Sequence, residues 1–135
     1  MPTVLVTGAS RGIGRSIVTY LAERGWDVIA AVRTEGDARQ FDRLPRVSAV
    51  LLDVTDDDRV AGLPDSIPGR LDAVVNNAGF VRDKMFVSCG EDEWDAVTRV
   101  HLKGHFCTSR HAAAYWRDEA KAGRMPEARI INTSS

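Results

Sequence analysis

The stretch TGASRGIG, residues 7–14, decides the fold because it joins a predicted strand to a predicted helix. The strand is the β-branched run of residues 3–7, and the helix follows from residue 15 until Gly25 ends its apolar pattern. The glycines that let the backbone approach a bound group closely are Gly8, Gly12 and Gly14. Because a helix start offers free N–H groups to an anion, the turn predicts a site for the phosphates of a dinucleotide.

The rest of the chain alternates between buried strands and helical segments. Further strands are predicted at residues 26–32, 47–54, 71–77 and 128–134. Between them we expect a short helix, a helix capped by Thr55, and a long helical pattern over residues 91–122 that is broken or bent near Gly104. This alternation predicts an α/β fold, a doubly wound parallel sheet of the Rossmann type. Residues 1–135 would form one dinucleotide-binding domain, truncated after the fifth strand and incomplete at its C-terminal end.

Composition narrows the range of partners. The 135 residues include 18 basic and 19 acidic side chains, for a net charge of −1, which favours neither nucleic acid nor a membrane surface as partner. The first residues lack the features of a signal peptide, so we expect a cytoplasmic protein. Cys89 and Cys107 lie outside any metal-ligand spacing and are expected to be free thiols, and no metal site is predicted.

Three motifs in order make the chain similar to a known family. The turn matches TGxxxGxG through Thr7 and the three glycines, NNAG follows at residues 76–79, and NTSS ends the fifth predicted strand at residues 132–135. With these motifs the chain resembles the short-chain dehydrogenases/reductases. The resemblance implies an oxidoreductase that interconverts a secondary alcohol and a ketone on a small molecule, and a homo-oligomer, dimer or tetramer, in which the long helix pairs with its copy.

One branch of the family is more similar than the rest. The stretches NNAGFVRDKMF, from residue 76, and DEWDAVTRVHLKGHF, from residue 92, resemble enzymes that act on 3-hydroxyacyl thioesters and the related 3-oxoacyl reductases. The resemblance therefore implies a 3-hydroxyacyl or 3-oxoacyl thioester as substrate.

The end of the second predicted strand bears on the choice between NAD and NADP. Arg33 stands near the place where NAD-selective members of the family carry an acidic residue, and Arg11 lies inside the glycine turn. Two arginines suit the 2′-phosphate of NADP, so the resemblance implies NADP rather than NAD. The alternative is that both arginines are solvated surface charges.

The remaining cofactor residues follow from the same resemblance. It implies that Asp53 accepts a hydrogen bond from the adenine and that Val54 packs on the ring, while the residues alone leave open an Asp53 that only caps the next helix. The full expected set is Gly8, Ser10, Arg11, Gly12, Ile13, Gly14, Arg33, Asp53, Val54, Asn77, Ala78 and Gly79.

The catalytic residues are only partly present. The resemblance gives Ser135 first, and Ser134 second, the role of bonding the substrate oxygen; the alternative is a serine that satisfies neighbouring backbone groups. His101 stands where most members carry asparagine. Three interpretations of it stay open: a packed or solvent-bridging histidine, a member of a proton relay in place of asparagine, or a metal ligand paired with His105.

The proton donor of the family is a tyrosine followed by a lysine four residues later. Neither Tyr20 nor Tyr115 has such a lysine. We therefore expect the parent protein to continue to this pair, and the 135-residue chain alone to be inactive. The alternative function is a non-catalytic dinucleotide-binding module or sensor, or an inactive fragment.

Overall fold

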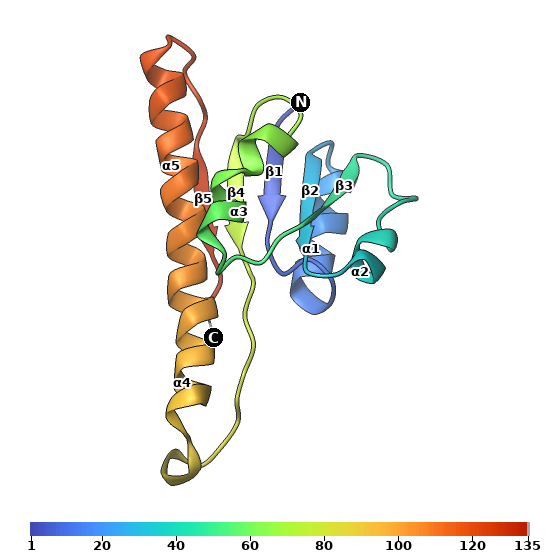
Figure 1. Ribbon diagram of the computed structural model, residues 1–135. Coiled ribbons are helices and arrows are strands. Elements are labelled where there is room, and N and C mark those ends of the chain that lie inside the picture. Colours follow the sequence, from blue (N-terminus) through green and yellow to red (C-terminus); the bar gives the residue numbers. More distant parts are fainter. Residues whose placement is uncertain (135) are drawn as a thin grey trace.

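The predicted sheet is present. Within residues 1–134, which the computed structural model describes, five parallel strands pair in the order β3-β2-β1-β4-β5 (Figure 1). They are β1 (Thr3–Val6), β2 (Asp27–Val32), β3 (Val47–Leu51), β4 (Ala73–Asn76) and β5 (Arg129–Asn132). Each is shorter than predicted by one to three residues. The chain winds outward from β1 to β3 and then returns to build β4 and β5 on the other side, which confirms the doubly wound α/β fold.

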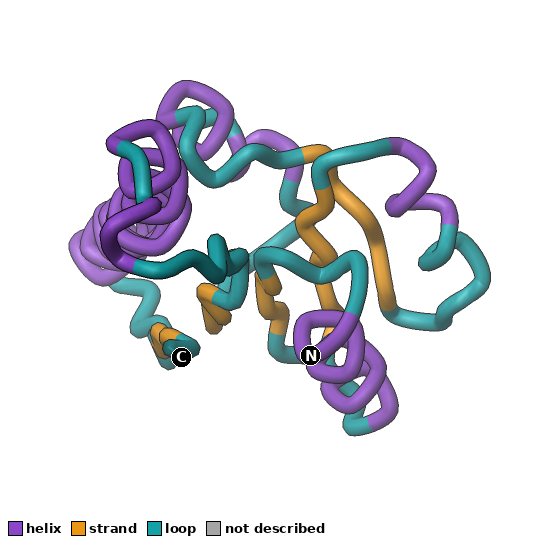
Figure 2. The backbone as a smooth tube through the Cα atoms, turned by 90° about the horizontal axis from the view of Figure 1, so that it is seen from below, coloured by secondary structure: helices purple, strands orange, loops and turns teal. Residues whose placement is uncertain are grey.

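Helices cover both faces of the sheet (Figure 2). They are α1 (Gly12–Glu23), α2 (Glu35–Arg39), α3 (Asp57–Ala61), α4 (Glu91–Thr98) and α5 (His105–Lys121), with short helices η1 (Leu63–Ser66) and η2 (Phe86–Ser88). Val4 and Val6 of β1 pack with Val18 of α1 on one face, whereas Leu5 packs with Trp116 of α5 on the other. The alternation follows from the two-residue period of a strand, and it gives the sheet two apolar cores.

The long helical segment changes pitch in its middle. A π-helical turn, η3 (Arg99–Gly104), joins α4 to α5 and interrupts the α-helical pattern at Gly104, where a break or bend was predicted. Gly104 is buried there, and a Cβ atom on it would lie 2.7 Å from Cγ2 of Val54. The turn therefore brings the helix close to the end of β3. No helix in residues 1–134 is both long enough and apolar enough to cross a membrane.

The start of α3 differs from the prediction. Asp56, rather than Thr55, caps this helix, because its carboxylate accepts a hydrogen bond from the Arg59 N–H at 3.2 Å. The hydroxyl of Thr55 instead donates to Oδ1 of Asp53 at 2.7 Å. The predicted Thr55 cap is wrong because the Thr55 hydroxyl forms its hydrogen bond with the carboxylate of Asp53 instead of with the start of the helix.

Candidate functional site

A cavity of about 310 Å³ lies at the carboxyl ends of β1, β2 and β4. The predicted cofactor residues that line it are Gly8, Ser10, Arg11, Ile13, Gly14, Arg33, Asp53, Val54, Asn77, Ala78 and Gly79. Five further residues of its lining were not singled out by the sequence motifs: Ala31, Val32, Leu52, Phe80 and Val100. The strand order reverses between β1 and β4, which is where doubly wound sheets bind ligands.

The glycines of the turn are required for two different reasons, a positive φ angle and the lack of space for a side chain. Gly8 has φ +63°, and a Cβ atom on it would lie 2.7 Å from the Cα atom of Ala78. A Cβ atom on Gly14 would collide with the carbonyl oxygen of Gly8. Gly12, in contrast, is not part of the cavity lining in the described structure and meets no neighbour, but its φ of +56° favours glycine. Gly12 thus permits the backbone conformation of the turn. Gly8 and Gly14 allow the backbone of the turn to lie close to the NNAG segment.

Thr7 ties the end of β1 to the end of β4. Its hydroxyl oxygen accepts hydrogen bonds from the N–H groups of Asn77 and Ala78, each at 3.0 Å, and donates to the Val75 carbonyl at 3.4 Å. The side-chain amide of Asn77 donates in turn to the Gly8 carbonyl at 3.4 Å. The glycine turn and the NNAG segment are therefore held together as one wall of the cavity.

Asn76 has a structural role beside this wall. It is buried, and its amide nitrogen donates to Asn132 of β5 at 2.8 Å and to Ser109 of α5 at 3.0 Å. Its side-chain oxygen Oδ1 accepts a hydrogen bond from the hydroxyl of Thr108. Asn76 thus joins β4 to β5 and to α5, and it does not line the cavity.

Asp53 presents a charged carboxylate at the cavity. Hydrogen bonds from the Thr55 hydroxyl and the Thr55 N–H hold the pKa of Asp53 below its ordinary value, and the positive charges of Arg99 and Arg33 lower it further, against the effect of burial. Because Asp56 caps α3, the alternative that Asp53 is only a helix cap is wrong. Its carboxylate remains ionised at neutral pH and can accept hydrogen bonds from a ligand.

His101 packs against the loop that follows β4. Its Nε2 atom lies 3.1 Å from the Phe80 nitrogen and 2.9 Å from the Phe80 carbonyl oxygen. The ring nitrogen either accepts from the N–H or donates to the carbonyl, depending on the tautomer. Its Cε1 atom would stand 2.5 Å from a Cβ atom on Gly79. His101 therefore holds the Gly79–Phe80 backbone, which lines the cavity, and this favours the interpretation of a packed histidine.

His105 does not complete a metal site with His101. Among the described residues, no three His, Cys, Asp or Glu side chains are grouped so that they could hold a metal ion. Burial lowers the pKa of His105, the nearby charge of His101 lowers it further, and a contact with the Ala78 backbone raises it. The ring is thus favoured in its neutral form, packed beside the NNAG segment.

Ser134, one of the two predicted serines, follows the carboxyl end of β5. Ser135 lies outside the described residues, and Ser134 is exposed. The preceding residue, Thr133, donates its N–H to the Asn76 carbonyl at 3.0 Å and its hydroxyl to Asn77 Oδ1 at 3.3 Å. The chain at Thr133 is thereby fixed beside the NNAG segment.

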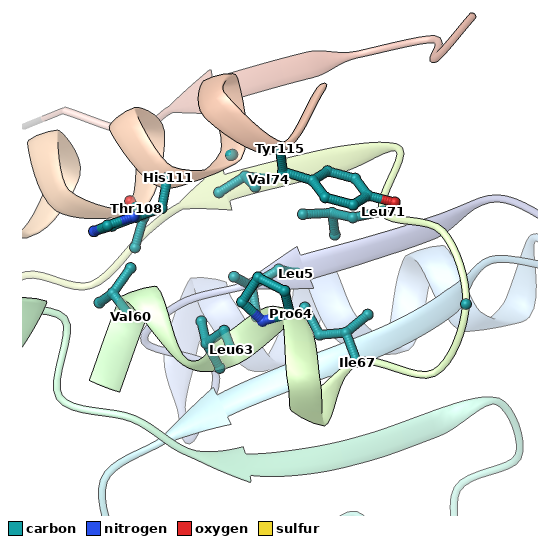
Figure 3. A pocket seen from close by; sticks show the side chains of 12 residues that line it. Leu5, Val60, Leu63, Pro64, Ile67, Leu71, Val74, Thr108, His111 and Tyr115 are labelled. Carbon is teal, nitrogen blue, oxygen red and sulfur yellow. The ribbon is translucent and has the colours of Figure 1, made fainter. Parts of the chain in front are cut away.

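A second, smaller cavity lies between the sheet, η1 and α5. It has a volume of about 50 Å³ and is lined mainly by apolar side chains, among them Leu5, Leu63 and Leu71. Figure 3 shows Tyr115 and His111 of α5 on one side of it. None of the predicted site residues lines this cavity. Tyr115 is thus placed away from the cofactor cavity, and Tyr20 lies on α1 with the Arg24 guanidinium 3.5 Å from its ring centroid.

Comparison with known proteins agrees with this architecture. Residues 2–135 match the family described as short chain dehydrogenase. Hydroxyacyl-CoA dehydrogenase ChsB1 of Mycobacterium tuberculosis is 41% identical and is aligned over 97% of this chain and 46% of its own length. The 3-oxoacyl-[acyl-carrier-protein] reductase FabG of Thermotoga maritima is 35% identical, over 97% of this chain and 54% of its own length.

Solved structures give the same result. The crystal structure of a short chain dehydrogenase from Mycobacterium avium superposes with a TM-score of 0.89 at 40% identity, and covers 99% of this chain and 53% of its own. The chain thus spans about half the length of the curated relatives it matches. On these matches, together with the glycine turn, the NNAG segment and the sheet order, the chain belongs to the short-chain dehydrogenase family.

Proposed function

We propose that this chain is the NADP-binding part of an oxidoreductase that interconverts a secondary alcohol and a ketone. The observation that carries the proposal is that segments far apart in the sequence line a single cavity at the switch point of the sheet. They supply glycines at a helix start, two arginines and a carboxylate. A dinucleotide needs this combination of anion-binding backbone, cationic side chains and hydrogen-bond acceptors.

The lining residues suggest how the cofactor would be held. The turn from Ser10 to Gly14 at the start of α1 would bind the pyrophosphate, since helix N–H groups favour anions. Asp53 and Val54 would contact the adenine, and the segment from Asn77 to Gly79 would border the nicotinamide ribose. NADPH, when bound, supplies the hydride that reduces a ketone.

The two arginines support NADP over NAD. Arg11 and Arg33 both line the cavity, and neither forms an ion pair with a carboxylate among residues 1–134. Their guanidinium groups are therefore free to bind a 2′-phosphate, and charge-assisted hydrogen bonds to phosphate are stronger than neutral ones. An NADH molecule would leave both cations without this partner.

The substrate class follows from the relatives. The names hydroxyacyl-CoA dehydrogenase and 3-oxoacyl-[acyl-carrier-protein] reductase support a 3-hydroxyacyl or 3-oxoacyl thioester. Ser135, or Ser134 in its place, would donate a hydrogen bond to the substrate oxygen, and His101 would position the Gly79–Phe80 backbone beside the nicotinamide. Serine alone transfers no proton at neutral pH, so we expect the 135-residue chain to bind the cofactor without turnover.

Self-association is a further part of the proposal. Trp94, Leu102 and Phe106 are 66%, 68% and 60% exposed on the α4–η3–α5 segment. Exposed large apolar side chains along one helical segment are typical of a subunit interface. We propose that copies of the protein associate through this segment.

Calorimetric titration of the chain with NADPH and NADH tests the proposed function. We expect NADPH to bind at least about tenfold more tightly than NADH, because one charge-assisted hydrogen bond is worth about 1.5–3 kcal/mol. The substitutions Arg11→Ala and Arg33→Ala should each reduce this preference. Equal affinities for the two dinucleotides would contradict the assignment of NADP, and NADPH oxidation by the 135-residue chain with acetoacetyl-CoA would contradict the expected lack of turnover.

A further inference from the structure

Gln40 connects two parts of the cavity wall, although none of the motifs includes it. It follows the last turn of α2, and its side-chain nitrogen donates a hydrogen bond to the Ser10 carbonyl at 2.8 Å. The contact is partly buried and joins residues thirty positions apart. One residue earlier in the turn, the Ala9 N–H donates to the Ala31 carbonyl of β2 at 3.2 Å. Two successive residues of the turn are thus tied to the β2–α2 segment.

The hydrogen bond from Gln40 to the Ser10 carbonyl fixes the orientation of the peptide group that joins Ser10 to Arg11. The described residues contain no cis peptide bond, so the Ser10 carbonyl and the Arg11 N–H point in opposite directions. Because the carbonyl is turned toward Gln40, the Arg11 N–H is turned away from α2. Arg11 then continues with extended backbone, at φ −157° and ψ 172°, before α1 begins. The direction in which Arg11 leaves the turn therefore depends on the Gln40 contact.

Helix α2, which precedes Gln40, begins beside the other arginine. Thr34, directly after Arg33, caps α2 by accepting a hydrogen bond from the Asp37 N–H at 3.1 Å. This cap joins Arg33 to the short helix α2, and Gln40 directly follows its other end. The Gln40–Ser10 contact consequently links the segment that carries Arg33 to the turn that carries Arg11.

We propose that Gln40 is a positioning residue for NADP selectivity, which holds Arg11 and Arg33 at the spacing that a 2′-phosphate requires. The proposal rests on the proposed function, since it concerns how the two arginines bind the phosphate. Gln40 itself does not line the cavity and need not touch the cofactor. Its effect should therefore fall on the preference between dinucleotides more than on dinucleotide binding as a whole.

Two substitutions in the full 135-residue chain test this role. Gln40→Met keeps the length of the side chain and removes the donor, whereas Gln40→Asn keeps the amide and shortens its reach. Asp42→Asn, at an exposed position two residues later, is the control. Each protein is titrated with NADPH and NADH, and its folding is checked by circular dichroism and urea unfolding.

We expect both Gln40 variants to bind NADPH about fivefold more weakly, the effect of one neutral hydrogen bond, with NADH affinity changed by less than about twofold. The Asp42→Asn protein should behave as the wild type. Suppose that the wild type prefers NADPH, but that both Gln40 variants bind NADPH and NADH more weakly by the same factor, or bind both as tightly as the wild type does. The role of Gln40 is then refuted, and the NADP assignment stands. If the wild type shows no preference for NADPH, the proposed cofactor fails, and the role of Gln40 fails with it.

Discussion

The imidazole ring of His101 occupies the space that a side chain at Gly79 would need. A Cβ atom on Gly79 would stand 2.5 Å from Cε1 and 3.0 Å from Nε2 of the ring. Gly79 lines the cofactor cavity, and His101 lies in the π turn between α4 and α5. The wall of the cavity and the π turn of the long helix are thus fitted to each other through these two residues.

Replacing Gly79 by alanine should disturb this fit. We expect Gly79→Ala to lower the free energy of unfolding by about 1–3 kcal/mol, the usual effect of an added methyl group in a packed site, and to weaken NADPH binding. Urea unfolding and calorimetric titration measure the two effects. Gly36→Ala is the matched control, because a Cβ atom there meets only Thr34 Oγ1 at 3.9 Å. In a helix that change should be neutral or stabilising.

The double variant Gly79→Ala/His101→Ala provides a stricter check of the same contact. Removing the ring creates room for the new methyl group, so the double variant should lose less stability than the sum of the two single changes. Additive losses would show that the two residues do not interact.

Loss of the Thr7 hydroxyl should loosen the junction between β1 and β4. Thr7→Val keeps the shape of the side chain but leaves the Asn77 and Ala78 N–H groups without their acceptor. We expect the free energy of unfolding to fall by about 1–3 kcal/mol, the cost of buried donors without partners. Urea unfolding measures the loss. Thr7→Ser retains the hydroxyl and should retain more of the stability; equal losses in the two variants would argue against the hydrogen bonds as the cause.

The contact between α3 and α5 should weaken in acid. Nε2 of His111 lies 2.9 Å from Oδ1 of Asp57, and this hydrogen bond is the main reason that the pKa of Asp57 lies below its ordinary value of 3.8. A group whose pKa is lower in the folded state stabilises the fold above its unfolded pKa. That contribution is lost as the pH falls below about 4, through the folded value.

Urea unfolding as a function of pH tests this contact. Asp57→Asn removes the charge, so its stability should depend less on pH than that of the wild type below about pH 4. Asp58→Asn removes a charge from the next position, which forms no ion pair with α5 among the described residues. It should keep the acid dependence of the wild type, and loss of that dependence in both variants would contradict the role of Asp57.

The small apolar cavity of Figure 3 offers a stabilising change. Val60→Ile adds one methylene group toward a space of about 50 Å³, so we expect a gain of about 0.5–1 kcal/mol in the free energy of unfolding. Val18→Ile is the control at a fully buried position on the other face of the sheet, outside both cavities, where overpacking should cost about 1–3 kcal/mol. Thermal and urea unfolding distinguish these outcomes, and a destabilised Val60→Ile would show that the space is not available.

Sequence predicts the sheet because buried parallel strands are nearly continuous hydrophobic runs, and the runs at β1, β2 and β4 are of this kind. It also predicts the glycine turn, because few residues tolerate the conformations of Gly8 and Gly12. Spacing alone could not decide whether Thr55 or Asp56 caps α3. That outcome depends on which carboxylate the Thr55 hydroxyl reaches in three dimensions.

Contacts between residues far apart along the chain could not be predicted from the sequence either. The bond from Gln40 to Ser10 and the fit of His101 against Gly79 join residues that are far apart along the chain. Neither pair carries a local signal such as a cap or a periodic pattern. Phe80 is an intermediate case, because it follows NNAG directly and could have been added to the cavity from its position alone.

A crystal structure of the chain with NADPH tests the central claim most directly. The account predicts electron density for the pyrophosphate over the turn from Ser10 to Gly14, with the adenine beside Asp53 and the 2′-phosphate between Arg11 and Arg33. Density for the dinucleotide at any other place, or a 2′-phosphate that contacts neither arginine, would contradict it.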